Sequence, residues 1–488
     1  MKWRHLNNRK KNNKQLVLWP RPCVFSYLPK AIRMYRKGLT TIVSLIILFI
    51  LSACRNSVLA QVRPTASQLA WADKEVGVII HFDINIFSPD SFDYNRRETL
   101  PPLEVFHPSQ LNTDQWIRAA KEAGASYAVL VAKHSTGFGL WPTRQYDYNI
   151  SHTPWKNGHG DVVADFIRSC RKYGLKPGIY CSTGFNTYLG VHNNDLTSTD
   201  SLRAYNKIVL GQLAELWSHY GPLFEIWFDG GVLATSKGGI SDQAAELVKR
   251  YQPQAILFQG PSSCGNLIRW VGNESGNAPY PLWSRADAVT ASNGLVKIND
   301  LHGNPDGAIW CPAESDFPNR QHSAWGGGWF WRSGEEDKVL TSEELVQLYY
   351  STVGNNSNML IGMAIDTSGA FPREDEARFA AFGRKIREQL KKSIAETSGT
   401  GRQLLLKLPS PSKVNHIILM EDLSTGENVR AYSLEARVNG KWQVVGNGIS
   451  IGHKRIQTTP DIVTTELRLK ITAADQTPAI RKFAAYYF

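Results

Sequence analysis

Short apolar runs alternate with amphipathic segments from about residue 68 to residue 271, and this alternation constrains the fold more than any other feature of the chain. The apolar runs predict strands buried on both faces at 76–82, 127–132, 175–181, 223–228, 255–259 and 268–271. Helical periodicity predicts helices at 113–123, 161–173, 202–220 and 242–251. Thr113 and Asp161 are expected to cap the first two helices, and Gly124 and Gly174 to end them. So long a series of strand and helix units favours an α/β fold with a closed (β/α) TIM-like barrel over an open sheet.

The pattern changes after about residue 400, where helical periodicity stops. Alternating runs predict strands at 403–407, 414–420, 432–438, 442–445, 466–471 and 483–488. Turn signals such as Asn439-Gly440 separate these runs, which is typical of an antiparallel β-sandwich. The small polar stretch at 396–401 is expected to link the two domains. The sequence therefore predicts a catalytic barrel over 61–398 and a sandwich over 399–488.

The formal net charge of +12 comes almost entirely from the N-terminal segment. Residues 1–53 contain eleven Lys and Arg residues and no Asp or Glu, so the rest of the chain is close to neutral. A near-neutral body lacks the basic surface that nucleic-acid binding requires, and no nucleic-acid partner is expected.

The N-terminal segment, residues 1–60, has the features of an export signal. An apolar run of 13 residues at 39–51 follows Arg36 and Lys37, and this length suits a signal peptide better than a membrane span. The tetrapeptide LSAC at 51–54 resembles a bacterial lipobox, which predicts a lipid on Cys54; the alternative is ordinary cleavage after Ala60. Met34 begins a more typical signal than Met1 does. We expect an exported protein, either a periplasmic or outer-membrane lipoprotein or a secreted one, with membrane attachment only through the lipid.

Polar residues placed just after barrel strands indicate where a barrel enzyme carries its chemistry. In this chain they are His81, Asp83, Lys133, His134, Asp229, Gln259 and Glu274. Two carboxylates on neighbouring loops, Asp229 and Glu274, suit glycoside hydrolysis. One must be ionised to attack the anomeric carbon, and the other must start protonated to help the leaving oxygen depart.

Each of these residues also has a simpler interpretation. Asp229 could belong to an Asp-Gly turn, Glu274 could be a solvated loop residue, and the histidines could be core side chains. The pair His81 and Asp83, at i and i+2, could instead ligate a metal. Trp329 lies in the Gly-hinged aromatic stretch 325–331, in a chain with 15 Trp, and this stretch could stack on sugar rings or seal the barrel against the sandwich.

Six motifs, taken together, resemble the family-29 α-L-fucosidases. They are VIIHF (78–82), KHSTGFGLW (133–141), TPWKNGHGDVV (153–163), GPLFEIWFDGG (221–231), IRWVGNESG (268–276) and WCPAESD (310–316). The forms of the third, fifth and sixth motifs are similar to the subgroup that prefers α-1,3/1,4-linked fucose. The C-terminal domain is similar to the discoidin-like domain of that subgroup, so the resemblance runs from about residue 66 to the C-terminus.

The resemblance implies an exo-acting, retaining hydrolase that releases terminal α-L-fucose from oligosaccharides or polysaccharides and uses no metal or other cofactor. It implies that Asp229 is the nucleophile and Glu274 the acid/base. The glycone-binding residues that it implies, together with the neighbouring residues that we expect to line the same pocket, are His81, Asp83, His134, Ser135, Trp141, Tyr180, Trp227 and Trp329.

The chain departs from the family pattern in segments expected to line the glycone pocket. Ser135 and Thr136 stand where the family has His and Asp, Asp83 stands where it has Gly, and residues 91–93 (SFD) replace Glu-Trp-Gly. Both catalytic carboxylates are intact, so we expect the reaction to be retained and the sugar specificity to have changed, with α-L-galactosides as an alternative substrate. A non-catalytic carbohydrate-binding protein and a metal-dependent hydrolase are further alternatives.

Overall fold

The computed structural model describes residues 62–290, 296–298, 301–321 and 327–488. The predicted signal segment, with Cys54 and the cleavage site after Ala60, lies outside these residues, as do residues 325 and 326 of the aromatic stretch. Within the described ranges, no helix is both long and apolar enough to cross a membrane.

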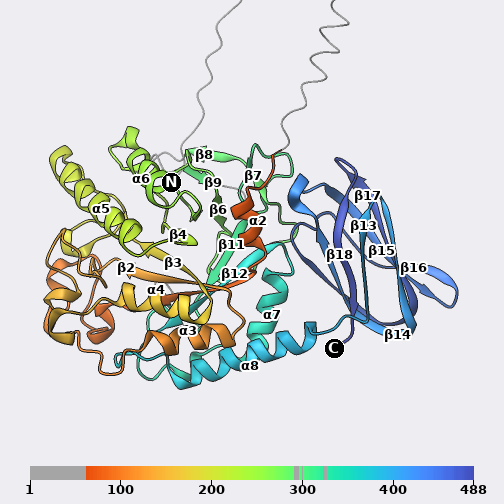
Figure 1. Ribbon diagram of the computed structural model, residues 1–488, viewed down its shortest axis with the longest axis horizontal. Coiled ribbons are helices and arrows are strands. Elements are labelled where there is room, and N and C mark those ends of the chain that lie inside the picture. Colours follow the sequence, from red (N-terminus) through yellow and green to blue (C-terminus); the bar gives the residue numbers. More distant parts are fainter. Residues whose placement is uncertain (1–61, 291–295, 299–300, 322–326) are drawn as a thin grey trace, which may run out of the picture. The chain divides into compact units, whose positions relative to one another are not determined.

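Eight parallel strands close into a barrel (Figure 1). The sequence predicted the closed barrel and six of these strands, and the last two were not predicted. Their order around the barrel is β1, β12, β11, β6, β5, β4, β3, β2. Their bounds are β1 Val76–His81, β2 Tyr127–Lys133, β3 Lys176–Cys181, β4 Glu225–Trp227, β5 Ile256–Phe258, β6 Leu267–Trp270, β11 Ala313–Phe317 and β12 Ser357–Ala364. Because all strands are parallel, their carboxyl ends meet at one mouth of the barrel.

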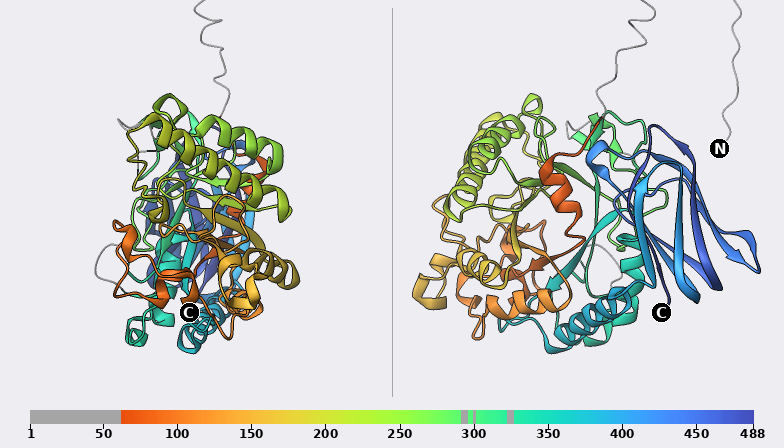
Figure 2. Two further views of the ribbon diagram at one scale, coloured as in Figure 1. Left: turned by 90° about the vertical axis from the view of Figure 1, so that its left-hand side faces the viewer. Right: turned by 45° about the vertical axis from the view of Figure 1, so that its right-hand side comes forward.

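Helices cover the outside of the strands (Figures 1 and 2). They are α3 Thr113–Glu122, α4 Val162–Tyr173, α5 Thr199–His219, α6 Ser241–Tyr251, α7 Ser342–Thr352 and α8 Arg373–Leu390. The predicted caps of α4 are confirmed: Asp161 accepts a hydrogen bond from the Ala164 N–H, and Gly174 ends the helix at φ 79°. For α3 the cap is Asn112, which precedes the predicted Thr113 and accepts bonds from two backbone N–H groups of the first turn.

In two places, the described chain between consecutive barrel strands contains no helix. A loop without a helix joins β5 to β6. In the described part of the connection from β6 to β11, two small antiparallel pairs take the place of a helix: β7 Arg285–Ala286 with β10 Ile309–Trp310, and β8 Ala288–Thr290 with β9 Val296–Ile298.

The short helix α2 (Ala66–Ala72) closes the barrel at the amino ends of its strands. The Trp71 indole packs in the barrel interior and donates a 3.3 Å hydrogen bond to Glu225 at the start of β4. The Asn358 amide donates to the Trp71 carbonyl, and the Gln68 amide donates to the Leu267 carbonyl, each at 2.9 Å. Because α2 closes the amino end of the barrel, the open mouth is the one at the carboxyl ends of the strands, where the polar side chains lie.

The C-terminal residues form an antiparallel β domain, as predicted. All six strands hydrogen-bond into one sheet in the order β13, β18, β14, β17, β15, β16. Their bounds are β13 Ala395–Thr400, β14 Gln403–Glu421, β15 Val429–Val438, β16 Lys441–Gly448, β17 Arg455–Ala474 and β18 Ala479–Tyr486.

Two details of this domain differ from the sequence prediction. The runs 403–407 and 414–420 belong to the single strand β14, whose register against β17 shifts between Lys407 and Ser412. Pro409 and Pro411 lie in that gap, and prolines cannot donate to the ladder, so the sequence pattern suggested a break. The predicted linker 396–401 is largely the edge strand β13, whose small polar residues pair with β18.

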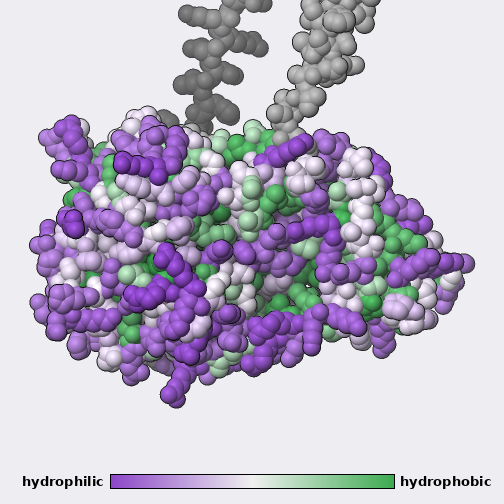
Figure 3. Space-filling view, in the orientation of Figure 1, coloured by the Kyte–Doolittle hydropathy of each residue, from purple (hydrophilic) through white to green (hydrophobic). Residues whose placement is uncertain are grey.

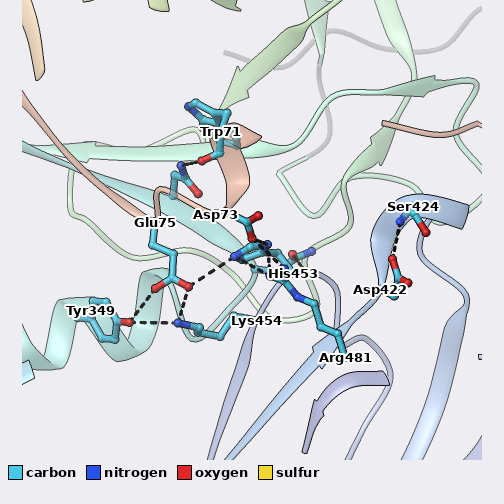
Figure 4. A network of polar contacts seen from close by, with 11 residues as sticks. Trp71, Asp73, Glu75, Tyr349, Asp422, Ser424, His453, Lys454 and Arg481 are labelled. Atoms are coloured by element: carbon cyan, nitrogen blue, oxygen red, sulfur yellow. Dashed lines mark hydrogen bonds and ion pairs between the residues drawn. The ribbon is translucent and has the colours of Figure 1, made fainter. Parts of the chain in front are cut away.

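A polar network joins the sheet to the foot of β1 (Figure 4). Glu75 accepts a 3.0 Å hydrogen bond from the Tyr349 hydroxyl, forms an ion pair with Lys454, and lies 3.5 Å from His453. Burial alone would raise the pKa of Glu75, but Lys454 and His453 outweigh burial and lower the pKa to about 2. The surface in Figure 3 is mostly hydrophilic over the helices, with hydrophobic residues visible over the C-terminal sheet.

Candidate active site

The predicted nucleophile Asp229 lies just beyond the carboxyl end of β4, where the chain turns away from the barrel. Positive φ angles at Gly230 (68°) and Gly231 (84°) permit this sharp turn. Asp229 is solvent-exposed, and its Oδ2 accepts a 3.0 Å hydrogen bond from the Tyr180 hydroxyl. Protein atoms crowd the carboxylate and raise its pKa by desolvation, while the hydrogen bonds from Tyr180 and the Gly230 N–H oppose this rise.

The predicted acid/base Glu274 lies in the loop that follows β6 and is also exposed. Its Oε2 accepts a 3.1 Å hydrogen bond from the Trp329 indole N–H. A single cavity of about 860 Å³ is lined by both Asp229 and Glu274, together with Trp227, Trp270 and other residues. The two carboxylates therefore face the same space, which has the size of a site for a substantial ligand.

A row of stacked rings runs along four neighbouring strands at this mouth. His134 stacks on Tyr180 with centroids 5.6 Å apart, and Tyr180 stacks on Trp227 at 5.5 Å. Trp227 in turn stacks on Phe258 of β5 at 3.8 Å. Because each ring is held by its neighbours, the Tyr180 hydroxyl has a fixed direction towards Asp229.

The two predicted glycone histidines lie together beside Trp329. The His81 and His134 rings meet edge to face at 5.9 Å, and His81 packs against Trp329 at 4.9 Å. Burial lowers the pKa of His81, with a further contribution from His134, and burial lowers the pKa of His134 to about 4. Both imidazoles are therefore neutral near pH 7 and can donate and accept hydrogen bonds. Ser135 lies next to them, its hydroxyl 3.0 Å from His134 Nδ1.

Asp83 does not offer a free acceptor to a sugar, contrary to the sequence expectation. It is 2% exposed, and its two carboxylate oxygens lie 2.9 and 2.8 Å from the Thr136 hydroxyl. Oδ1 also accepts a 2.6 Å bond from the Ile84 N–H, which caps the short helix that follows. Burial raises the pKa of Asp83 to about 7. Its partner Thr136 is distant in sequence, so no local pattern revealed this pairing.

Trp141 and Lys133 point away from the cavity, towards helix α5. The Trp141 indole is buried in the outer core and donates a 2.9 Å hydrogen bond to Glu215. Lys133 is buried as well, and its Nζ donates to Gln212 at 3.0 Å. The structure therefore assigns Trp141 to packing rather than to the sugar pocket in which the sequence placed it. Gln259, by contrast, lines the cavity as expected and has a positive φ of 50°.

Residues 57–389 match the family model described as Alpha-L-fucosidase. The chain belongs to the α-L-fucosidase family. It is 28% identical over 463 residues to α-L-fucosidase 1 of Arabidopsis thaliana, an alignment that covers 87% of each chain.

Solved structures agree with this membership. A Bacteroides thetaiotaomicron protein assigned as an α-L-fucosidase superposes with a TM-score of 0.82 at 35% identity, covering 88% of this chain and all of the other. A glycoside hydrolase 29 family member from an unknown rumen bacterium superposes with a TM-score of 0.74 at 30% identity, covering 88% of this chain and 77% of the other. This α-L-fucosidase family member is accordingly a glycosidase that acts on O-glycosyl bonds, and its substrate is a glycan.

A third carboxylate in the fucosidase cavity escaped the sequence analysis. Asp316 of β11 lines the cavity and accepts a 2.6 Å hydrogen bond from the Trp270 indole N–H. Burial raises the pKa of Asp316 well above its ordinary value, and the neighbouring charges of Glu274 and Glu314 raise it further. The signal was present in the motif PAESD: Glu314 and Asp316 are two residues apart, so on a strand both point to the same face.

Two more carboxylates lie deeper in the barrel, below the row of rings. Glu314 accepts a 2.6 Å hydrogen bond from the Tyr127 hydroxyl and a 3.0 Å bond from the Trp227 indole N–H. Burial raises the pKa of Glu314, and burial and the charge of Glu314 raise the pKa of its neighbour Glu225. Glu314 thereby fixes the orientation of Trp227, two residues before Asp229.

The metal alternative finds no support in the placement of its proposed ligands. His81 packs against Trp329, while Asp83 turns to Thr136. Across the described residues, no group of three or more His, Cys, Asp or Glu side chains is arranged to hold a metal ion. The residues that line the cavity include carboxylates and indoles, and His81 and His134 are not among them.

Proposed function

We propose that this protein is an exo-acting, retaining α-L-fucosidase in which Asp229 is the nucleophile and Glu274 the acid/base. The observation that carries the proposal is that both carboxylates line one cavity but have different partners. Asp229 accepts a hydrogen bond from the Tyr180 hydroxyl of β3, and Glu274 accepts one from the Trp329 indole N–H, so different parts of the chain hold the two carboxylates.

In the first step, Asp229 attacks the anomeric carbon while Glu274 gives its proton to the leaving oxygen. The bond to the aglycone breaks as the bond to the Asp229 carboxylate forms, and a covalent glycosyl-enzyme results. In the second step, Glu274 takes a proton from water, and the water oxygen displaces Asp229 from the anomeric carbon. Each step inverts the anomeric centre, so the released sugar keeps the α configuration.

The neutral imidazoles of His81 and His134 suit hydrogen bonds to sugar hydroxyls, and the Trp329 face suits the apolar side of a pyranose. The proposed glycone is terminal α-L-fucose, in the α-1,3 or α-1,4 linkage that the sequence resemblance favours. The small side chain of Ser135, beside His134, favours α-L-galactose as a second candidate glycone, because that sugar differs from fucose by a hydroxyl on C6.

The proposal is tested with aryl α-L-fucoside and aryl α-L-galactoside. Wild type should cleave the fucoside faster, and Asp229→Asn should lose at least about 10³-fold in kcat/KM. Asp200→Asn, a change at an exposed carboxylate on α5, is the matched control and should leave the rate unchanged. Faster cleavage of the galactoside would transfer the proposal to the second glycone, and sugar binding without turnover of any glycan would replace it with a binding protein.

Retention is tested with Glu274→Gln and azide. An aryl leaving group needs little protonation, so this variant should form the glycosyl-enzyme and then stall for lack of a base. Azide needs no base and should restore turnover, and retention requires that the product be α-L-fucosyl azide. A β-L-fucosyl azide from this variant would contradict the assigned roles.

We also propose that the protein is exported and anchored by a lipid on Cys54. The support is the sequence pattern at 39–54 alone. Labelled palmitate should enter the wild-type protein in a bacterial host and be absent from Cys54→Ala. A mature protein that begins at Gln61 would instead identify ordinary cleavage after Ala60.

A further inference from the structure

Asp83 and Thr136 form a closed pair between the ends of two neighbouring barrel strands. Both side chains are at least 98% buried, and the Thr136 hydroxyl lies within 2.9 Å of both Asp83 oxygens. Neither residue lines the cavity that Asp229 and Glu274 share. Burying a carboxylate without a cationic partner costs free energy. The position of Asp83 between these strands therefore indicates a role in positioning them.

Backbone hydrogen bonds anchor the pair at both ends. The Ile84 N–H donates to Asp83 at 2.6 Å, and the Phe138 N–H donates to the Thr136 hydroxyl at 3.0 Å. A continuous series of four groups therefore ties the loop after β1 to the loop after β2. Within this series, the two backbone bonds each stay inside one loop, and the contact between Asp83 and Thr136 is the one that joins the two loops.

The pair stands two residues beyond each glycone histidine. Asp83 follows His81, and Thr136 follows His134, at the same spacing. The two imidazole rings touch at 5.9 Å, and both pack against Phe330, at 5.2 and 5.0 Å. A change in the separation of the two loops would change the separation of the two imidazoles.

We propose that Asp83 and Thr136 are positioning residues that set the spacing of His81 and His134 and thereby the binding of the glycone. This inference rests on the proposed function, because it assigns the histidines to the sugar. The pair acts through the histidines and does not touch the reacting atoms.

The two residues can be exchanged without backbone strain, which provides a sharp test. Asp83 has extended backbone angles (φ −146°, ψ 160°), which a threonine adopts readily, and a threonine hydroxyl can also cap the helix that follows. Thr136 is not among the residues with positive φ. An aspartate at 136 can accept the Phe138 N–H, because Asp side chains bond the backbone two residues on.

The experiment compares Thr136→Val, Asp83→Thr and the exchange of both residues, Asp83→Thr with Thr136→Asp. The readouts are kcat and KM for aryl α-L-fucoside and the inhibition constant of free L-fucose. Each single variant should raise KM and weaken L-fucose binding by about tenfold, with a smaller change in kcat. The double exchange should restore both constants to within about threefold of wild type.

The matched control is Thr113→Val, which removes a buried hydroxyl pair, 2.8 Å to Ser169, between α3 and α4. It should lower the melting temperature as Thr136→Val does but leave KM unchanged. The proposal is overturned if the folded single variants keep the wild-type KM, or if the double exchange folds and does not recover it. If wild type itself cleaves no fucoside and binds no fucose, the failure lies with the proposed function and not with the pair.

Discussion

The Tyr180 hydroxyl is a side-chain partner of Asp229, and the effect of this bond on the pKa of Asp229 has a definite sign. A hydrogen bond donated to a carboxylate stabilises the ionised form and so lowers the pKa of Asp229, against the rise caused by desolvation. A nucleophile must be ionised to attack, so the bond extends activity towards lower pH.

Tyr180→Phe removes this bond and keeps the ring in its stack. The pKa of Asp229 should rise, and the acidic limb of the profile of kcat/KM against pH should move to higher pH, with a loss of about 10–100-fold at the optimum. The measurement is the pH profile on aryl α-L-fucoside. An acidic limb that stays in place would assign that limb to a group other than Asp229.

Asp316 is the opposite case, a carboxyl whose pKa is raised by burial, which favours its neutral form. Its raised pKa means that asparagine is close to it in both shape and charge, and Asn Oδ1 can still accept the Trp270 N–H. Asp316→Asn should keep kcat/KM within about threefold at pH 7, whereas Asp316→Ala should lose about tenfold because the indole loses its acceptor. A large loss in Asp316→Asn would show that the ionised carboxylate is required.

At the scale of elements, apolar runs predicted six of the eight barrel strands, while β12 (SNMLIGMA), buried along its whole length, was missed. The first six barrel strands lie in runs rich in apolar residues and were predicted with bounds close to those observed. β11 (AESDF) was not predicted, because it turns Glu314 and Asp316 inwards and so has no apolar run. In the site, the strand-end rule predicted Asp229 and Glu274, which line one cavity, and two histidines, which lie side by side. Asp83 and Trp141 were misplaced, because their partners Thr136 and Glu215 are distant in sequence.

Glu75, directly before β1, provides a test of how much the polar contact between barrel and sheet stabilises the protein. Glu75 has a folded-state pKa of about 2, below its ordinary value, so its ionised form adds stability above the ordinary pKa, and this stability is lost as pH falls towards 2. Glu75→Gln leaves the buried Lys454 without its charge partner and should lower the free energy of unfolding by about 3 kcal/mol at pH 7. Calorimetry should show this difference shrinking between about pH 4.5 and pH 2. A difference that is constant with pH would contradict the ionised state assigned to Glu75.

At the scale of the whole molecule, within the residues that the structure describes, the buried carboxylate of Glu427 in the C-terminal domain accepts hydrogen bonds from two separate segments of the barrel domain. It accepts hydrogen bonds from the Ser284 N–H at 2.8 and 3.0 Å, from the Ser284 hydroxyl at 2.6 Å and from the Asn356 amide at 2.8 Å. Ser284 lies in the connection from β6 to β11, and Asn356 directly precedes β12. All these hydrogen bonds would be lost if the sheet left the barrel, so the two domains are expected to unfold together.

Glu427→Ala tests this cooperation. It removes an acceptor from several buried donors and should cost about 3 kcal/mol, because each unsatisfied group bears its full desolvation penalty. Wild type should melt in one calorimetric transition whose van't Hoff and calorimetric enthalpies agree, and the variant should move that transition as a whole to lower temperature. Two transitions, only one of which moves, would mean that barrel and sheet fold independently.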